Sequence, residues 1–320
     1  MPVPVHLVCG FLGAGKTTLL RRLLASQPSQ ERLAVLVNEF GKLGIDGRLL
    51  EGFDSTVREL AGGCICCELR LNFVSCLQDI LHAFSPDRIV VETTGLADPA
   101  DIVAAVEDAS AGGALELASL ITVVDCELFS KRDMFGASYF NQIKAADLLL
   151  LNKTDLLEPE EVVPMSEELA RLNPRARIMP VVHCAVDREI ILDPLPGSER
   201  PRPPAPARLD QGLESLAAPS AKLGHTGQGD DGFLAFSFQD PRPLDRGCLE
   251  KFLSQLPWQV FRVKGFVRLE QGGLMLNYTY RRPEFQTSQP PEATNLAFVA
   301  WQVEPEDILL RLRQCLNEST

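Results

Sequence analysis

The chain of 320 residues is 45% hydrophobic and 23% charged, and its formal net charge at pH 7 is -12. This composition is ordinary for a soluble globular protein and argues against a disordered chain. The acidic balance argues against sequence-independent binding to nucleic acid or anionic lipid, because both need clustered Lys and Arg.

The hydropathy of the chain predicts no membrane span and a cytoplasmic location. No run of 18 apolar residues occurs, and the segment that begins MPVP has no basic region followed by an apolar stretch and a cleavage site. Nine cysteines are too sparse for a disulfide scaffold. Six of them are isolated and are predicted to be thiols, mostly buried as small core residues: Cys9, Cys76, Cys126, Cys184, Cys248 and Cys315.

The first predicted unit is a strand at residues 3–9, a glycine-rich turn and a leucine-rich helix at residues 17–26. The turn matches the Walker A pattern, in which glycines let backbone N–H groups point at phosphates. Lys16 would reach the β and γ phosphates, and the Thr17 hydroxyl would ligate Mg²⁺. The alternative is a turn that binds nothing. The predicted nucleotide-binding residues of this segment are Gly10, Gly13, Ala14, Gly15, Lys16, Thr17 and Thr18.

The polar segment NEFGKLGID at residues 38–46 follows the next apolar run. Its glycines and acids suit a switch loop near the γ phosphate. Either Glu39 or Asp46 is a candidate to orient the attacking water or the Mg²⁺ shell, and the alternative for each is an ordinary polar loop residue.

Three cysteines, Cys64, Cys66 and Cys67, lie within four residues after two glycines. This spacing suits a soft metal such as Zn²⁺ or Cu(I), because the thiolates can converge on one ion. Three thiolates leave a fourth position open, which favours transfer over permanent storage. The alternatives are a redox thiol pair and simple packing.

The histidines are isolated in sequence, and each is predicted to be structural rather than a metal ligand. The four are His6, His82, His183 and His225. His183 and His225 are the better ligand candidates, because they lie in predicted loops.

The apolar run at residues 89–91 ends in Glu92, Thr93, Thr94 and Gly95. P-loop enzymes carry at this place an acid that holds Mg²⁺ directly or through water, and Glu92 is the candidate. Gly95 could place a backbone N–H against the γ phosphate, so that residues 96–99 would move on hydrolysis.

The tetrapeptide Asn152-Lys153-Thr154-Asp155 directly follows an apolar run and matches the guanine-reading NKxD motif. Ligands are expected at the carboxyl edge of a parallel sheet. The Asp155 carboxylate would accept two hydrogen bonds from one edge of guanine, which adenine does not offer. A surface turn is the alternative.

Apolar runs alternate with helical patterns through the first part of the chain, which predicts an α/β fold with helices on both faces of a P-loop NTPase parallel sheet. The runs after the first lie at residues 33–37, 88–91, 120–124, 148–151 and 178–182. Proline- and glycine-rich residues 191–232 then predict a linker between a P-loop GTPase domain at 1–190 and a smaller α+β domain at 233–320. In that second domain strands are predicted at 233–238, 260–269, 274–280 and 296–301, and helices at 248–256 and 306–316.

The motifs GFLGAGKTT, NEFG, GGCICC, ETTGLADP, VVD and NKTD, in this order, resemble the CobW-type metallochaperone GTPases, a branch that includes zinc chaperones. The resemblance covers residues 3–187 strongly and the second domain more weakly, through FRVKGFV at 261–267. It implies that Cys64, Cys66 and Cys67 correspond to the family's metal-binding CxCC. Two departures argue against a secondary metal-holding site: Lys42 stands where many relatives have an acid, and the linker has only His225 where many have a histidine-rich stretch.

Together these features predict a GTP hydrolase that gives GDP and phosphate and uses Mg²⁺. The resemblance implies that this hydrolysis drives the handover of Zn²⁺ to a client metalloprotein, with cobalt and nickel less favoured as cargo. Neither nucleic acid nor a membrane is an expected partner, and a homodimer is left open. The alternative is a low-turnover sensor or scaffold that binds guanine nucleotide and metal, since no arginine finger or water-positioning glutamine is identifiable. A kinase or a nucleic-acid enzyme is disfavoured by NKTD and by the acidic charge.

Overall fold

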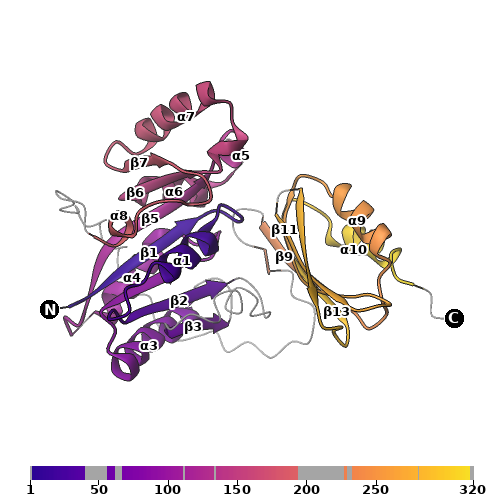
Figure 1. Ribbon diagram of the computed structural model, residues 1–320, viewed down its shortest axis with the longest axis horizontal. Coiled ribbons are helices and arrows are strands. Elements are labelled where there is room, and N and C mark those ends of the chain that lie inside the picture. The colour runs from indigo at the N-terminus through magenta and orange to yellow at the C-terminus, as the bar shows by residue number, and fades with distance from the viewer. Residues whose placement is uncertain are drawn as a thin grey trace, which may run out of the picture.

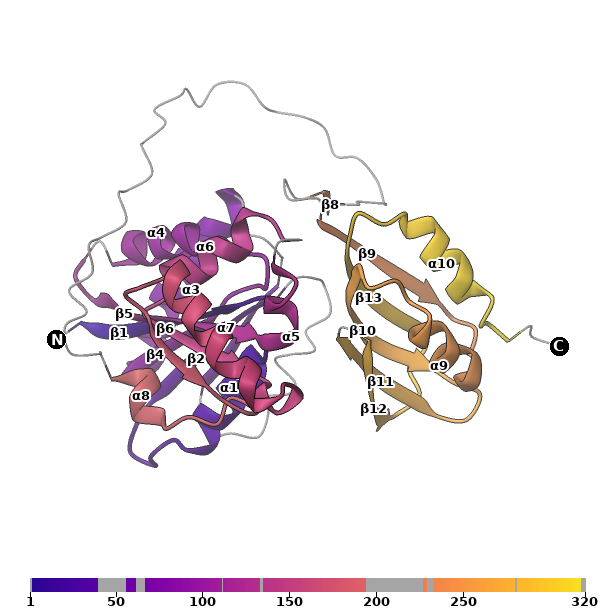
Figure 2. The same ribbon diagram turned by 90° about the horizontal axis from the view of Figure 1, so that it is seen from above.

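A computed structural model gives the structure of the chain and describes residues 2–39, 56–61, 67–110, 112–132, 135–193, 227–228, 233–279 and 281–317. The described residues form a seven-stranded parallel sheet and a six-stranded antiparallel sheet. The two sheets and their helices stand next to each other in both ribbon views (Figures 1 and 2).

The parallel sheet has the strand order β3-β2-β4-β1-β5-β6-β7, with β1 at its centre. Register pairs Val8 with Glu92 and Gly10 with Val123, so that neighbouring strands end at one common carboxyl edge. The strands are β1 Val3–Gly10, β2 Leu33–Glu39, β3 Thr56–Ala61, β4 Arg88–Glu92, β5 Leu115–Asp125, β6 Leu148–Asn152 and β7 Arg177–Pro180.

Helices cover both faces of this sheet, as its continuous apolar strands require. One apolar cluster joins the sheet to α3 Cys67–Phe84, α4 Pro99–Ala109, α6 Ala137–Ala145 and α7 Pro159–Leu172. A second cluster joins the other face to α1 Lys16–Ala25 and α8 Arg188–Leu192. The short helices α5 Cys126–Phe129 and η2 Thr154–Leu156 follow β5 and β6 directly. The predicted α/β class with helices on both faces is therefore confirmed.

The antiparallel sheet has the order β12-β11-β10-β13-β9-β8, and two helices pack on one of its faces. The helices, α9 Arg246–Ser254 and α10 Pro305–Arg313, lie on the side away from the parallel sheet (Figures 1 and 2). The strands are β8 Gly227–Gln228, β9 Phe233–Asp240, β10 Val260–Arg268, β11 Gly273–Thr279, β12 Arg282–Ser288 and β13 Thr294–Trp301. This confirms a C-terminal α+β unit.

Three strands were not predicted, and most of the predicted linker lies outside the described residues. The first strand is β12, an edge strand whose side chains are mostly exposed and therefore leave no apolar pattern. The second is β3, a six-residue edge strand with the mixed sequence TVRELA. The third is β8, which lies within the predicted linker and pairs with β9. The domain boundaries at 190 and 232 stay predictions.

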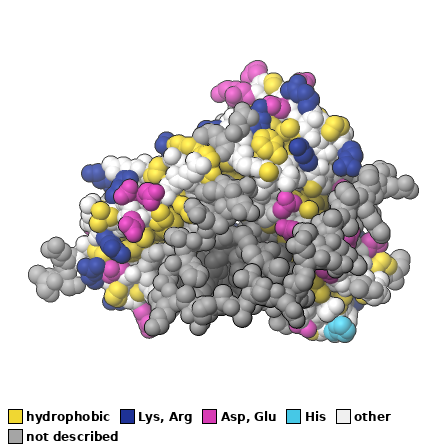
Figure 3. All heavy atoms as spheres, turned by 180° about the vertical axis from the view of Figure 1, so that it is seen from behind, with side chains coloured by type: hydrophobic (Ala, Val, Ile, Leu, Met, Phe, Trp, Pro, Cys, Tyr) yellow, Lys and Arg dark blue, Asp and Glu magenta, His cyan; other side chains and the backbone are white. Residues whose placement is uncertain are grey.

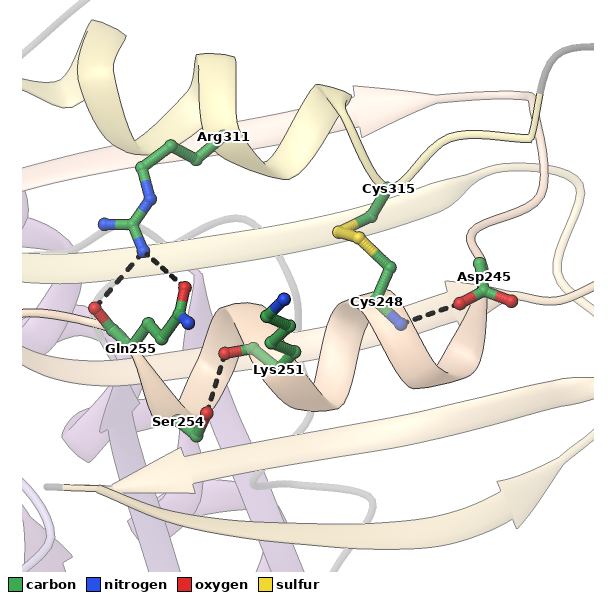
Figure 4. The surroundings of a disulfide bond; sticks show 7 residues. All are labelled: Asp245, Cys248, Lys251, Ser254, Gln255, Arg311 and Cys315. Atoms are coloured by element: carbon green, nitrogen blue, oxygen red, sulfur yellow. Dashed lines mark hydrogen bonds between the residues drawn. A yellow bond between two sulfur atoms is a disulfide. The ribbon is translucent and has the colours of Figure 1, made fainter.

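The expectation that the isolated cysteines are thiols is wrong for one pair. Cys248 and Cys315, which are 67 positions apart in the sequence, form a disulfide that ties α9 to the residues after α10 (Figure 4). Sequence inspection missed this pair because only the packing of α9 beside α10 brings the two sulfurs together. Cys9, Cys126 and Cys184 are buried thiols as expected, whereas Cys76 is partly exposed.

The described surface carries charges of both signs. On the face shown in Figure 3, acidic and basic side chains lie interspersed among apolar and neutral ones. None of the described helices combines the length and the hydropathy that a membrane crossing requires.

Candidate nucleotide-binding site

The loop between β1 and α1 adopts a backbone that its glycines make possible. Gly10, Gly13 and Gly15 have φ angles of 141°, 76° and 120°, which L side chains rarely adopt. A Cβ on Gly10 would lie 2.4 Å from the Val123 carbonyl oxygen, and one on Gly15 would lie 2.5 Å from Asn152 Nδ2. The loop can therefore approach β5 and β6 only with glycine at these positions.

The N-terminus of α1 offers an anion-binding site. No side chain caps this helix end, and no acidic residue lies in its first turn. The partial positive charge of the helix end is thus not neutralised from within the helix. The buried Lys16 ammonium donates to the carbonyl oxygens of Gly10 at 2.8 Å and Phe11 at 3.2 Å, which holds it over the loop. Thr18, which follows Thr17, is exposed.

The structure brings Thr17 and Glu92 together, although 75 positions separate them. The Thr17 hydroxyl donates to Glu92 Oε1 at 3.3 Å. Burial raises the pKa of Glu92, while the charges of Lys16 and Arg262 and the hydrogen bond from Thr17 oppose the shift. A hydroxyl and a carboxylate are hard oxygen donors, and this pair fits Mg²⁺ by its chemistry. Nearby in the chain, the buried Thr94 hydroxyl has no hydrogen-bond partner among the described residues.

The segment after β4 passes close to the glycine-rich loop. A Cβ on Gly95 would lie 2.7 Å from the Leu12 backbone nitrogen, so this approach also requires glycine. The buried Gln142 amide donates to the carbonyl oxygens of Gly95 at 3.1 Å and Ala97 at 3.0 Å. These two hydrogen bonds anchor the segment to α6.

Asn152 connects the NKTD tetrapeptide to the phosphate loop. Its side-chain amide donates to the Ala14 carbonyl at 2.8 Å, and its Oδ1 accepts from the Cys184 backbone N–H at 2.9 Å. The Lys153 ammonium pairs with the buried Asp125 carboxylate at 2.6 Å. Asp155 lies in η2 with an exposed side chain.

Sequence inspection missed the turn at His183 and Cys184 as part of this site. Both residues have positive φ angles, and Cys184 Sγ lies 3.4 Å from the Gly15 carbonyl oxygen. Burial raises the pKa of the Cys184 thiol to about 12, which keeps it protonated and makes it a packing group. Asp125, which ends β5 and pairs with Lys153, was likewise not predicted as a site residue. Asp125 lies at the end of a strand, and His183 and Cys184 lie shortly after one; these positions are the signal that could have found them.

The predicted cysteine cluster lies almost wholly outside the described residues. Cys64 and Cys66 fall there, and Cys67 begins α3 without a described side chain. Glu39 ends β2, where its backbone pairs with Ala61 at the carboxyl edge, and its side chain is not described. Asp46, Lys42 and the segment around them also fall outside.

The histidines show no metal site in the described part of the chain. His6 is buried, with Nδ1 2.7 Å from Ser119 Oγ, and His82 Nδ1 lies 2.7 Å from the Gln78 carbonyl oxygen. His183 is exposed, and its carbonyl oxygen accepts from Arg22. His225 is outside the described residues. Among the residues that are described, no three His, Cys, Asp or Glu side chains gather as metal ligands.

Aromatic residues join the glycine-rich loop to the antiparallel sheet. The Phe11 ring meets the Phe261 ring of β10 edge-on at 5.5 Å and lies 4.8 Å from Phe135. Trp258 and Trp301 pack against the same cluster. The nucleotide site is thus in contact with the second sheet.

Comparison with known proteins shows which families the chain is similar to. Residues 4–180 match the family model described as "CobW/HypB/UreG, nucleotide-binding domain", and residues 233–316 match the "Cobalamin synthesis protein cobW C-terminal domain". A crystal structure of Zn(II)-bound YjiA GTPase from E. coli aligns with 99% of this chain and 100% of its own, at 23% identity and a TM-score of 0.46.

Three curated relatives resemble the chain over different lengths. Zinc chaperone YeiR of Escherichia coli is 29% identical over 283 residues, which is 85% of each chain. Zinc-regulated GTPase metalloprotein activator 1 of Schizosaccharomyces pombe is 35% identical over 58% of this chain and 47% of its own. Zinc chaperone CobW of Pseudomonas aeruginosa is 35% identical over 54% of this chain and 55% of its own. Since the first family model matches more than half of the chain, the protein belongs to the CobW/HypB/UreG nucleotide-binding family.

Proposed function

We propose that this protein hydrolyses GTP and couples the reaction to the handover of zinc to a client metalloprotein. The observation that carries the proposal is the hydrogen bond from Asn152 to the Ala14 carbonyl, which joins the guanine-reading tetrapeptide to the phosphate loop. This hydrogen bond supports phosphate and base recognition at the same carboxyl edge of the sheet. Relatives named as zinc chaperones and as a zinc-regulated GTPase support the same role.

The phosphates of GTP would lie over the N-terminus of α1. Backbone N–H groups of the loop would donate to them, and Lys16 would turn from its carbonyl partners to the β and γ phosphates. Thr17 and Glu92 would hold Mg²⁺, which supplies charge neutralisation on the β and γ oxygens when bound. Asp155 would accept from guanine, and the Gly95 N–H would face the γ phosphate.

Water activation is assigned to Glu39 or Asp46. The backbone of Glu39 ends β2 beside the end of β4, because Val37 pairs with Glu92. A carboxylate there could accept a proton from the attacking water or order it through the Mg²⁺ shell.

Zinc, as cargo, would be bound by Cys64, Cys66 and Cys67. Thiolates are the ligands that Zn²⁺ prefers, and a three-thiolate site leaves one position for a ligand of the client. Ala61, three residues before the first of these cysteines, pairs with Glu39 at the end of β2. A change of the β2 end with nucleotide state would therefore be transmitted directly to the cysteine segment.

The test is GTP turnover of the full chain with and without Zn²⁺, together with zinc affinity measured by competition with a chromophoric chelator. We expect turnover that depends on Mg²⁺ and changes with zinc, and zinc affinity that differs between the GDP and GTPγS states. Lys16→Ala removes the turnover, whereas Lys144→Ala, at an exposed lysine of α6, leaves it unchanged. Replacing Cys66 and Cys67 by Ser removes tight zinc binding and retains nucleotide binding. Guanine-nucleotide binding with negligible turnover under every condition would instead support a sensor or scaffold.

A further inference from the structure

The antiparallel sheet turns its helix-free face to the nucleotide site. Helices α9 and α10 cover one face, and the other face is directed at the parallel sheet (Figures 1 and 2). Thr279, the last residue of β11, reaches the glycine-rich loop so closely that a Cβ on Gly13 would lie 1.9 Å from its Cγ2. An ion pair at 3.0 Å between Arg282 of β12 and Glu127 of α5 adds a second contact between the two units.

Arg262 is a direct neighbour of both residues that contact the glycine-rich loop, Phe261 and Thr279. It is the cross-strand partner of Thr279 in the β10–β11 register. The register of β10 with β13 is irregular between Val260 and Arg262, so that Arg262 can share a face with its neighbour Phe261, whose ring contacts Phe11. Directly opposed residues of an antiparallel pair share a face of the sheet. Arg262 therefore belongs to the face that meets the phosphate loop, and its side chain is half-buried there.

The charge of Arg262 also acts on the buried carboxylate of the site. After Lys16, it is the charge that most lowers the pKa of Glu92. The antiparallel sheet thus contributes a second cation to the carboxyl edge where Thr17 and Glu92 meet. The first cation, Lys16, comes from the parallel-sheet unit.

We propose that Arg262 places its guanidinium against the γ phosphate of bound GTP, so that the second sheet completes the catalytic site; this inference rests on the proposed GTP hydrolysis. In that reaction water attacks the γ phosphorus, the bond to the β–γ bridging oxygen breaks, and the products are GDP, inorganic phosphate and a proton. Negative charge spreads over the γ oxygens in the transition state. A permanently charged, planar guanidinium with five N–H donors matches those oxygens.

The experiment compares Arg262→Gln, which keeps length but removes charge, with Arg262→Lys, which keeps charge but removes the planar fork. Arg268→Ala is the matched control, because Arg268 lies on the same strand and its guanidinium donates within the second unit, to the Glu292 carbonyl. For each full-length variant, the dissociation constants of GTPγS and GDP are measured with Mg²⁺, and kcat and KM are measured with GTP.

We expect Arg262→Gln to lower the preference for GTPγS over GDP at least about tenfold and kcat about a hundredfold or more. Arg262→Lys recovers part of both losses, and Arg268→Ala changes neither. The proposal would be overturned if the GTPγS-to-GDP preference of Arg262→Gln stayed within about twofold of that of the parent. Such a result includes equal weakening of the binding of both nucleotides, which a merely structural role of Arg262 would produce. A parent protein without turnover contradicts the proposed function instead, and the ratio of the two dissociation constants still tests Arg262.

Discussion

The two sheets differ in how they are covered. The parallel sheet is packed by helices on both faces, and its functional residues stand at one edge, where the strands end. The antiparallel sheet has helices on one face only, and residues in or at the ends of β10, β11 and β12 contact the other unit. A sheet that helices cover on both faces can bind ligands only where its strands end, whereas a sheet with one uncovered face can make contacts across that whole face. The second sheet is thus equipped to form one side of a site that the first sheet holds.

Removal of the disulfide is expected to cause the largest loss of stability, and this loss is confined to the unit built on the antiparallel sheet. Replacing Cys248 by Ser should lower the free energy of unfolding of this unit by about 2–4 kcal/mol, because the bond closes a long loop. Chemical denaturation with and without reducing agent measures the change, and the reducing agent should have no further effect on the variant. Nucleotide affinity should be unchanged, since Cys248 and Cys315 lie on the far side of the sheet. A loss of nucleotide affinity in Cys248→Ser would show that the two units do not behave separately.

Gly13→Ala tests the contact between the sheets. Its φ of 76° strains any L residue, and the added Cβ collides with Thr279 Cγ2, so we expect a loss of about 1–3 kcal/mol. Gly112→Ala is the control, because a Cβ there meets nothing within 4 Å. Adding Thr279→Ser to Gly13→Ala removes the colliding methyl and should recover part of the stability in a double-mutant cycle. Strict additivity would contradict the contact.

Asp155→Asn tests a part of the site to which the antiparallel sheet does not contribute. An amide cannot accept both guanine N–H hydrogen bonds, so GTP affinity should fall about 10- to 100-fold, while affinity for xanthosine triphosphate rises. Competition binding of the two nucleotides measures the change. Glu160→Gln, in the neighbouring helix α7 and also exposed, should leave both affinities as they are. Unchanged GTP affinity in Asp155→Asn would contradict the base assignment.

Glu92→Gln should have opposite effects on nucleotide binding and on stability. Glu92 lies at the carboxyl edge of the parallel sheet, where Lys16 of one unit and Arg262 of the other both contribute positive charge. Because burial raises the pKa of Glu92, the unfolded chain ionises this group at lower pH than the folded one. Its contribution to stability is therefore lost as pH rises from the ordinary glutamate range towards the folded pKa. Without nucleotide, the variant should melt about 2–4 °C higher than the parent near neutral pH and equally at low pH. It should also lose Mg²⁺-dependent GTP binding; a lower Tm at neutral pH would contradict this account.

The sequence predicted best those features that depend on residues close together in the chain. The Walker A glycines, the NKTD tetrapeptide and Glu92 follow apolar strands directly, and each lies at the carboxyl edge as the α/β pattern predicts. The same locality explains the misses. The β12 strand is exposed and polar, and the Cys248–Cys315 bond spans 67 positions. Neither Arg262 nor Thr279 stands in a phosphate-binding motif, and only tertiary packing brings their strands to the loop.

The aromatic cluster between the sheets also gives the protein an internal optical probe. The chain has two tryptophans, Trp258 and Trp301, whose ring centroids are 6.0 Å apart beside Phe261. All indole fluorescence of the molecule therefore originates at the junction of the two units. If the sheets separate during the nucleotide cycle, water reaches the indoles and the emission moves to longer wavelength. Without any label, stopped-flow fluorescence can thus time the movement against phosphate release.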